Sequence, residues 1–287
     1  MLRRQLAILI SSCCLALPAH ALDLGKLLSG ENLDSAIKVI GNVSEAVKEV
    51  TPQQEIIIGQ SVMANLLGAA PLVKDAALQK YVNQVGMWVA AQSEEPTLAW
   101  HFGIIDSPNI NAFAAPGGYI LITRGMWDRI RSEAELAVVL GHEITHVLKK
   151  HHLRAMRGDK WQGALSETIT LGASVKGVKG GQKILTNLGK AGSEVFVRGL
   201  DKGDEYDADN YGMVLAARAG YNPYALVSVL QTLGTVNAAD ATVALMFSTH
   251  PSPQDRLDKL ESNIGDQLEN YAGGAENTPR FSKFKKP

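Results

Sequence analysis

Two histidines and a glutamate of the sequence are spaced so that they could bind and use a metal ion: His142, Glu143 and His146. On an α-helix, residues four apart lie on one face, about 40° apart around the axis, so both imidazoles can reach the same cation. Glu143 would then lie beside the cation, where its carboxylate can take a proton from water. This HExxH spacing predicts a zinc site with its own general base.

The alternative is a group of polar residues on a solvated helix face, which would have polar neighbours. The neighbours are apolar instead: Leu136, Val138, Val139, Leu140, Ile144 and Val147. A helix that is apolar nearly all round is buried, so we expect the histidines to point into the protein.

His151 and His152 follow closely and raise the question of a further histidine ligand. In the metzincin pattern HExxHxxGxxH, a glycine lets the chain leave the helix and bring the last histidine back to the metal. Lys149 stands at that position and favours a continuing helix. We therefore expect His151 and His152 to face solvent and to bind nothing.

A carboxylate is the remaining candidate for a third ligand, since catalytic zinc sites keep three protein ligands and one open position. Glu205 and Asp209 share one face of a predicted helix with Ala208 and Gly212, whose small size would permit close packing. The alternative is an acidic first turn that favours the helix dipole. We assign Glu205 to the metal and Asp209 to the other ring N–H of His142 or His146, and expect Asp207 to face away.

The elements that must position these residues are mostly helical. Helices are expected over 22–50, from Pro52 to about Leu67, over Ala76–Ala91, after the capping sequence Ser132–Glu135, over Asp204–Ala219 and over Tyr224–Leu233. Strands are expected over Leu98–Ile105, Asn111–Ala114 and Tyr119–Thr123, the last two joined as a hairpin by a Pro-Gly-Gly turn. The composition of 265–287 predicts a disordered tail.

The first residues predict export. Residues 1–21 combine two arginines, a short apolar run and a small-residue cleavage site, the layout of a signal peptide, so we expect a periplasmic protein. Lipid attachment at Cys13 is the alternative. Cleavage removes the two cysteines of the chain and the arginines Arg3 and Arg4, taking the formal net charge from −1 to −3. We expect no nucleic-acid partner and no membrane span in the mature protein.

Several motifs occur in a fixed order along residues 52–262. They are Gln54-Glu55 with Gly59, Asn111–Gly118, Glu133–Ala137, Gly141–His146, Glu205 with Ala208 and Asp209, and His250-Pro251 with Arg256. In this combination the chain resembles the zinc metalloprotease family of the CAAX prenyl endopeptidase and the HtpX heat-shock protease (peptidase family M-forty-eight). Within that family it is most similar to the soluble periplasmic branch of BepA- and LoiP-like proteases. The prenyl-peptide substrate of the membrane-embedded relatives is not carried over.

The resemblance implies an α+β fold, a mainly helical gluzincin domain over 51–264 with a small antiparallel sheet or hairpin at the active-site cleft. It implies that an extended substrate adds to an edge-strand wall, whose residues are Asn111, Ala112, Phe113, Tyr119 and Leu121. The alternative is that these residues form an ordinary hairpin that binds no substrate.

The resemblance also gives roles to His250 and Arg256. One of them would stabilise the oxyanion, or His250 would plug the zinc. The alternatives are a plain loop for His250 and an ion pair for Arg256.

The expected function is that of a zinc endopeptidase with Zn²⁺ on His142, His146 and Glu205, and Glu143 as the base. The family branch implies unfolded or misassembled envelope proteins as substrates and suggests the outer-membrane assembly machinery as a partner. The competing hypothesis is a periplasmic chaperone or assembly factor whose zinc site is structural or plugged.

Overall fold

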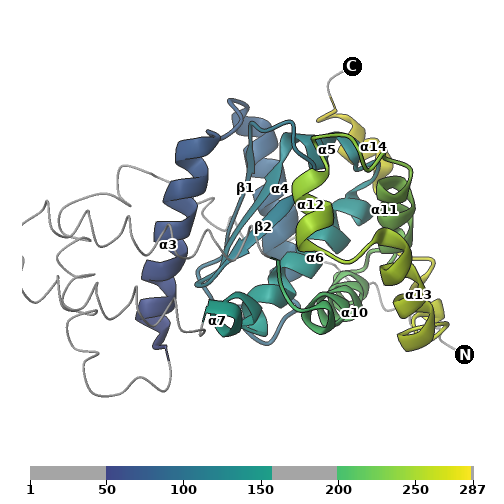
Figure 1. Ribbon diagram of the computed structural model, residues 1–287. Helices are drawn as coiled ribbons and strands as arrows, with labels where there is room; N and C mark the ends of the chain where they lie inside the picture. Colours follow the sequence, from purple (N-terminus) through teal and green to yellow (C-terminus); the bar gives the residue numbers. More distant parts are fainter. Residues whose placement is uncertain (1–49, 157–198, 286–287) are drawn as a thin grey trace, which may run out of the picture.

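The computed structural model describes residues 50–156 and 199–285, which form helices around a three-stranded sheet (Figure 1). The first group of helices is α3 (Pro52–Ala69), α4 (Ala76–Ala90), α5 (Arg124–Arg129), α6 (Glu133–Leu148) and α7 (His151–Met156). The second is α10 (Lys202–Arg218), α11 (Ala225–Gly234), α12 (Ala244–Thr249), α13 (Pro253–Asn263), the short 3₁₀ helix η1 (Glu269–Tyr271) and α14 (Thr278–Ser282).

The mainly helical α+β class is confirmed, and the helices expected from Pro52 onward begin and end close to their predicted positions. The predicted signal peptide (1–21) and all but the last residue of the helical segment predicted for 22–50 lie outside the described residues. Within the described ranges, no helix combines the length and apolar character needed to cross a bilayer.

The strands are ordered β1 (His101–Ile105), β3 (Tyr119–Thr123), β2 (Ala112–Ala115). β1 runs parallel to β3, and β2 runs antiparallel to it. The sheet is therefore mixed, and the antiparallel expectation holds only for the β2–β3 hairpin. Gly117 and Gly118 close that hairpin with φ of 80° and 93°, a region that glycine enters without strain.

The position of β3 corrects part of the expected edge-strand wall. Tyr119 and Leu121 lie on the central strand, whose backbone is paired with β1 on one side and β2 on the other, so they do not belong to an edge. Among the described strands, β2 is the edge next to the hairpin turn, and it carries Ala112 and Phe113.

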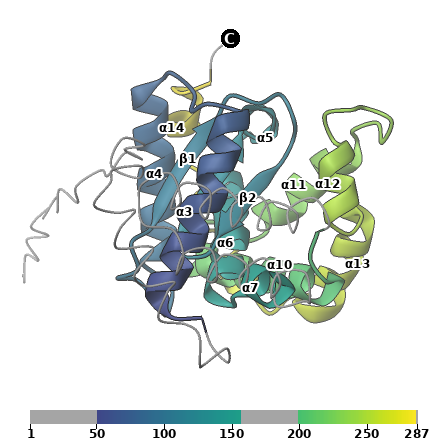
Figure 2. The ribbon, with the colours of Figure 1, turned by 60° about the vertical axis from the view of Figure 1, so that its left-hand side comes forward.

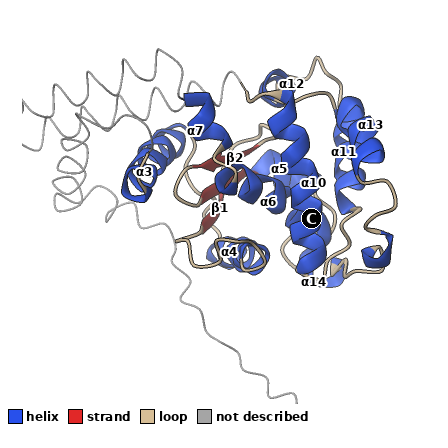
Figure 3. Cartoon of the chain, turned by 90° about the horizontal axis from the view of Figure 1, so that it is seen from below, coloured by secondary structure: helices blue, strands red, loops and turns tan. Residues whose placement is uncertain are grey.

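The two faces of the sheet are covered by different helices, because alternate strand residues point to opposite sides. Phe113 and Leu121 pack with Ile58 of α3 in one apolar cluster. Phe102 and Ile120 join the larger core that includes α4 and α6. Figure 3 shows α3 and α6 on opposite sides of the strands. Burying each such side chain contributes about 1.5–3 kcal/mol to the stability of the fold, so the helices on both faces stabilise the sheet.

Helix α6 begins at the expected cap. Ser132 Oγ accepts a hydrogen bond from the backbone N–H of Glu135 at 3.1 Å. The Glu135 carboxylate accepts from the backbone N–H of Arg131 at 2.7 Å, one residue before the cap. Only the serine half of the predicted capping box therefore forms.

Replacing this cap gives a direct measure of its contribution. Ser132→Ala is expected to lower the free energy of unfolding by about 1 kcal/mol, because the N–H of Glu135 loses its acceptor. Both variants lose the hydrogen bond that Ser132 Oγ donates to Glu276 at 2.8 Å, but Ser132→Gly should cost less than Ser132→Ala, since glycine is itself a tolerated N-cap. Denaturant unfolding of both variants checks this, and equal losses would contradict a capping role.

Residues 265–285 fold onto the domain, so the prediction of a disordered tail is wrong. Phe281 of α14 is 1 % exposed, and its ring centroid lies 4.7 Å from that of Trp127. Phe284 stacks on Tyr81 with centroids 4.1 Å apart. Two aromatic side chains anchor this otherwise polar stretch. Figure 2 shows α14, in yellow, behind the upper part of α4.

A buried carboxylate at the start of α6 completes this attachment. Glu133 accepts hydrogen bonds from the hydroxyls of Tyr81 and Tyr221, at 2.6 and 2.7 Å, and from the Asn277 amide at 3.0 Å. Arg280 of α14 pairs with the same carboxylate. Burial raises the pKa of Glu133, but these donors outweigh it and lower the pKa below its ordinary value. The C-terminal segment is thereby tied to the helix that carries the HExxH motif.

Candidate metal centre

Helices α6 and α10 approach each other at two glycines. A Cβ on Gly212 would lie 2.7 Å from the backbone nitrogen of His142, and one on Gly141 would lie 2.8 Å from the carbonyl oxygen of Gly212. Such distances are closer than side chains tolerate, so only glycine allows this crossing. Ala208, fully buried on the same face, fits the expected close packing. The crossing brings Glu205 of α10 opposite the histidines of α6.

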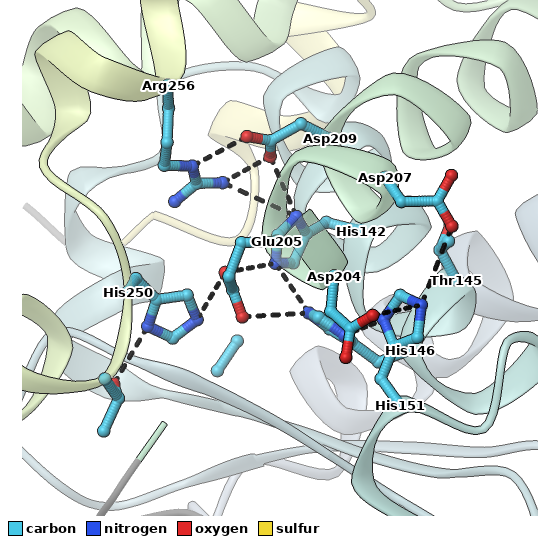
Figure 4. Close-up of polar contacts among 12 residues, drawn as sticks. His142, Thr145, His146, His151, Asp204, Glu205, Asp207, Asp209, His250 and Arg256 are labelled. Atoms are coloured by element: carbon cyan, nitrogen blue, oxygen red, sulfur yellow. Dashed lines mark hydrogen bonds and ion pairs between the residues drawn. The ribbon is translucent and has the colours of Figure 1, made fainter. Parts of the chain in front are cut away.

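The three predicted ligands converge at this crossing (Figure 4). The Nε2 atoms of His142 and His146 lie 3.0 Å apart, and each lies 3.6 Å from a carboxylate oxygen of Glu205. Donor atoms around a tetrahedral zinc ion, with bonds of about 2.0–2.2 Å, are separated by about 3.3–3.6 Å. All three residues are buried, at 4 % exposure or less. The spacing therefore fits one zinc-sized cation.

The unpaired polar atoms of the centre also fit a cation. Oε2 of Glu205 is buried and accepts no hydrogen bond from any described residue. His142 Nδ1 is held by Asp209 Oδ1 at 2.9 Å, as predicted, which leaves its Nε2 facing inward. Burial lowers the pKa of His142, but Asp209 and Glu205 outweigh it and raise the pKa to about 9. The two carboxylates thus favour positive charge at this point.

Glu143 and His146 are suited to different tasks by their burial. Burial lowers the pKa of His146 well below its ordinary value, so its ring is neutral and can donate a lone pair. Burial raises the pKa of Glu143 to about 7, where a carboxylate can both take and return a proton. Glu143 also lines both hollows described below, so it borders the space that a substrate would enter.

Two hollows meet at the predicted active site, and both are lined by Asn111, Ala112, Glu143 and His250. The first, of about 320 Å³, also includes Phe113 and Ala114 of the edge strand β2. The second, of about 390 Å³, is lined mainly by apolar side chains: Met126, Val139, Leu226, Val229, Leu233 and Met246. Tyr119 and Leu121 line neither, and the Tyr119 hydroxyl instead accepts a hydrogen bond from Gln60 at 3.1 Å.

His250 lies at the metal centre. Its Nε2 is 3.5 Å from Oε2 of Glu205, and the ligand atoms of His142, Glu205 and His250 all lie within 4.8 Å of one another. The plain-loop alternative for His250 is therefore not supported. Its role as an oxyanion donor or as a plug stays a prediction.

Arg256 is buried against Asp209. Its Nε donates to Oδ2 of Asp209 at 2.8 Å and its Nη2 donates to Oδ1 at 2.5 Å. Burial raises the pKa of Asp209, but Arg256 and His142 outweigh it and hold the pKa well below its ordinary value. The geometry thus gives Arg256 the ion pair that the sequence left open, and its role at the oxyanion stays untested.

The histidine pair after the motif is not where we expected it. His151 and His152 are buried, with 1 % and 8 % exposure, so the prediction that they face solvent is wrong. Helix α6 ends at Leu148, and Lys150 turns the chain with a φ of 54°, in the left-handed region. The chain therefore returns toward the site instead of continuing as a helix. Lysine is not a residue typical of the left-handed region, so the sequence did not predict this turn.

Two helices that bring together two histidines and two buried glutamates beside a small sheet have the arrangement of an HExxH metallopeptidase. Residues 76–264 match the sequence profile of peptidase family M48, and the chain belongs to that family.

Relatives of known name support this assignment. The chain is 28 % identical to the beta-barrel assembly-enhancing protease of Yersinia pestis, over 98 % of this chain and 57 % of the relative. It is 30 % identical to the protein of that name in Escherichia coli K12, over 71 % of this chain and 42 % of the relative. It is also 27 % identical to the mitochondrial metalloendopeptidase OMA1 of Arabidopsis thaliana, over 78 % of this chain and 44 % of the relative. The chain spans about half the length of these relatives.

Proposed function

We propose that this protein is a zinc-dependent endopeptidase of the periplasm that hydrolyses peptide bonds in unfolded or misassembled envelope proteins. The observation that carries the proposal is the convergence of His142, His146 and Glu205 on one point, with the buried Glu143 beside it. The predicted signal peptide supports export, and the names of the bacterial relatives support substrates or partners in β-barrel assembly.

Different residues of the chain have different roles in the proposed reaction. Zn²⁺ held by the three ligands would act as a Lewis acid and lower the pKa of water to about 7. The Glu143 carboxylate takes a proton from the attacking water and returns it to the leaving amine nitrogen. Asp209 keeps the Nδ1 proton of His142 in place, so that Nε2 presents its lone pair.

An extended peptide fits the edge strand. Among the described strands, β2 pairs only with β3, and the family resemblance places an extended substrate along the other edge of such a strand. Ala112 and Glu143 line the same two hollows, which supports a peptide that lies along β2 beside Glu143. The apolar lining of the second hollow favours an apolar side chain beside the cleaved bond. Unfolded proteins expose such stretches, and folded ones bury them.

The proposal is tested by measuring bound metal and cleavage of unfolded casein with and without a chelator. We expect about one zinc per chain and at least a tenfold loss of cleavage on chelation, restored by added zinc. A chain that cleaves equally well without metal would overturn the proposal.

A plugged site in a chaperone or assembly factor is the second candidate, and one contact favours it. The Thr249 hydroxyl donates to the carbonyl of Leu245 at 2.8 Å, so it accepts from Nδ1–H of His250, 2.9 Å away. The lone pair of His250 Nε2 then points toward Glu205, as a fourth ligand would. In the casein assay, His250→Ala should raise cleavage if His250 is a plug and lower it if His250 is an oxyanion donor.

A further inference from the structure

His151 contacts the back of a metal ligand. Its Nδ1 lies 2.8 Å from Nδ1 of His146, and the two ring centroids are 4.9 Å apart (Figure 4). His146 uses its other nitrogen, Nε2, to face His142 and Glu205. His151 is therefore the residue placed to control the outer nitrogen of His146.

The proton between the two rings can be assigned by elimination. If both Nδ1 atoms carried lone pairs, or both carried protons, they would repel each other at 2.8 Å. His146 must keep its lone pair on Nε2 to bind a cation, so its neutral ring carries the proton on Nδ1. His146 is then the donor, and His151 accepts through Nδ1 and carries its own proton on Nε2.

The outer side of His151 faces negative charge, as this tautomer requires. Its Nε2 lies 3.7 Å from Oδ1 of Asp204 and 3.6 Å from Oδ2 of Asp207. Arg154 holds Asp204 with a contact of 2.5 Å, and Lys149 lies 3.9 Å from Asp207. Asp207, which points away from the metal ligands as expected, thus helps to orient His151.

We propose that His151 is a positioning residue that fixes the tautomer and ring orientation of His146 for metal binding. The proposal rests on the metal site of the proposed function. It gives the two histidine ligands different supports: His142 donates to the carboxylate of Asp209, whereas His146 donates to a neutral imidazole. Lys150 makes the second support possible, because its left-handed turn returns the chain to His146.

The test compares His151→Leu, which removes the acceptor, with His151→Asn, whose amide oxygen can replace Nδ1. Zinc affinity of the full chain is measured by competition with a chromophoric chelator. His151→Leu should bind zinc about 10–100-fold more weakly, as is typical when the partner of a ligating histidine is lost. His151→Asn should recover most of that loss. The absorption spectrum of the Co²⁺-substituted protein should shift in His151→Leu and return toward wild type in His151→Asn.

Leu153→Ala is the matched control. Leu153 is 3 % exposed on the same short helix and belongs to the apolar cluster with α3. Its truncation destabilises α7 without touching His146, so thermal stability should fall while zinc affinity and the Co²⁺ spectrum stay unchanged. Melting of the metal-free His151 variants shows that they are folded.

The outcomes separate this inference from the proposed function. Wild-type protein that binds no zinc overturns the proposed function. Zinc bound by wild type and equally well by His151→Leu overturns only the role of His151. Equal loss of zinc affinity in His151→Leu, His151→Asn and Leu153→Ala would show that α7 supports the fold and does not position His146.

Discussion

Glu143→Gln is expected to lose casein cleavage by about 10²–10⁴-fold while keeping its zinc, because the amide cannot accept the proton of the attacking water. Glu143 is 4 % exposed, and among the described carboxylates it alone lines both hollows. Glutamine keeps the shape of the side chain, and the ligands His142, His146 and Glu205 are untouched. The loss should therefore appear in kcat, with little change in metal content.

Two measurements make this result decisive. Metal analysis of Glu143→Gln must show the wild-type zinc content, since a loss of zinc would explain inactivity without a role as base. Glu261→Gln, an exposed position on α13, controls for the change of charge and should cleave as wild type does. Full activity of the zinc-loaded Glu143→Gln protein would refute the assignment of the base.

Arg256→Met is expected to lower the free energy of unfolding by about 3–5 kcal/mol, because it leaves the buried Asp209 without its cation. Asp209 is 1 % exposed and accepts two hydrogen bonds from Arg256, so the substitution leaves its charge without these donors. Denaturant unfolding measures the loss. Lys259→Met, an exposed position on the same helix, should change stability by no more than about 0.5 kcal/mol.

The double variant Arg256→Met with Asp209→Leu separates stability from metal binding. Replacing both charges by apolar side chains should recover much of the stability, because no unpaired charge remains buried. Zinc affinity should stay about 10–100-fold weaker than in wild type, since His142 Nδ1 no longer has its acceptor. Recovery of zinc affinity together with stability would contradict the role of Asp209 in orienting His142.

Most of the fold follows from local patterns. The helices that became α3, α4, α6, α10 and α11 could be predicted because caps and apolar periodicity act within one or two turns. The pairing of β1 with β3 could not, since strand order depends on contacts between residues far apart in the sequence. The C-terminal segment was missed because its attachment depends on a few aromatic side chains and on Glu133.

The amino-acid sequence alone specified two of the candidate metal ligands, because a spacing of four on a helix places His142 and His146 together whatever surrounds them. It also indicated Glu205 and Asp209 by the same spacing. The partners of these residues depend on tertiary structure. Arg256 reaches Asp209 only because α13 lies beside α10, and His151 reaches His146 only because the chain turns at Lys150. Local spacing determines which side chains share a face, and long-range packing determines what meets that face.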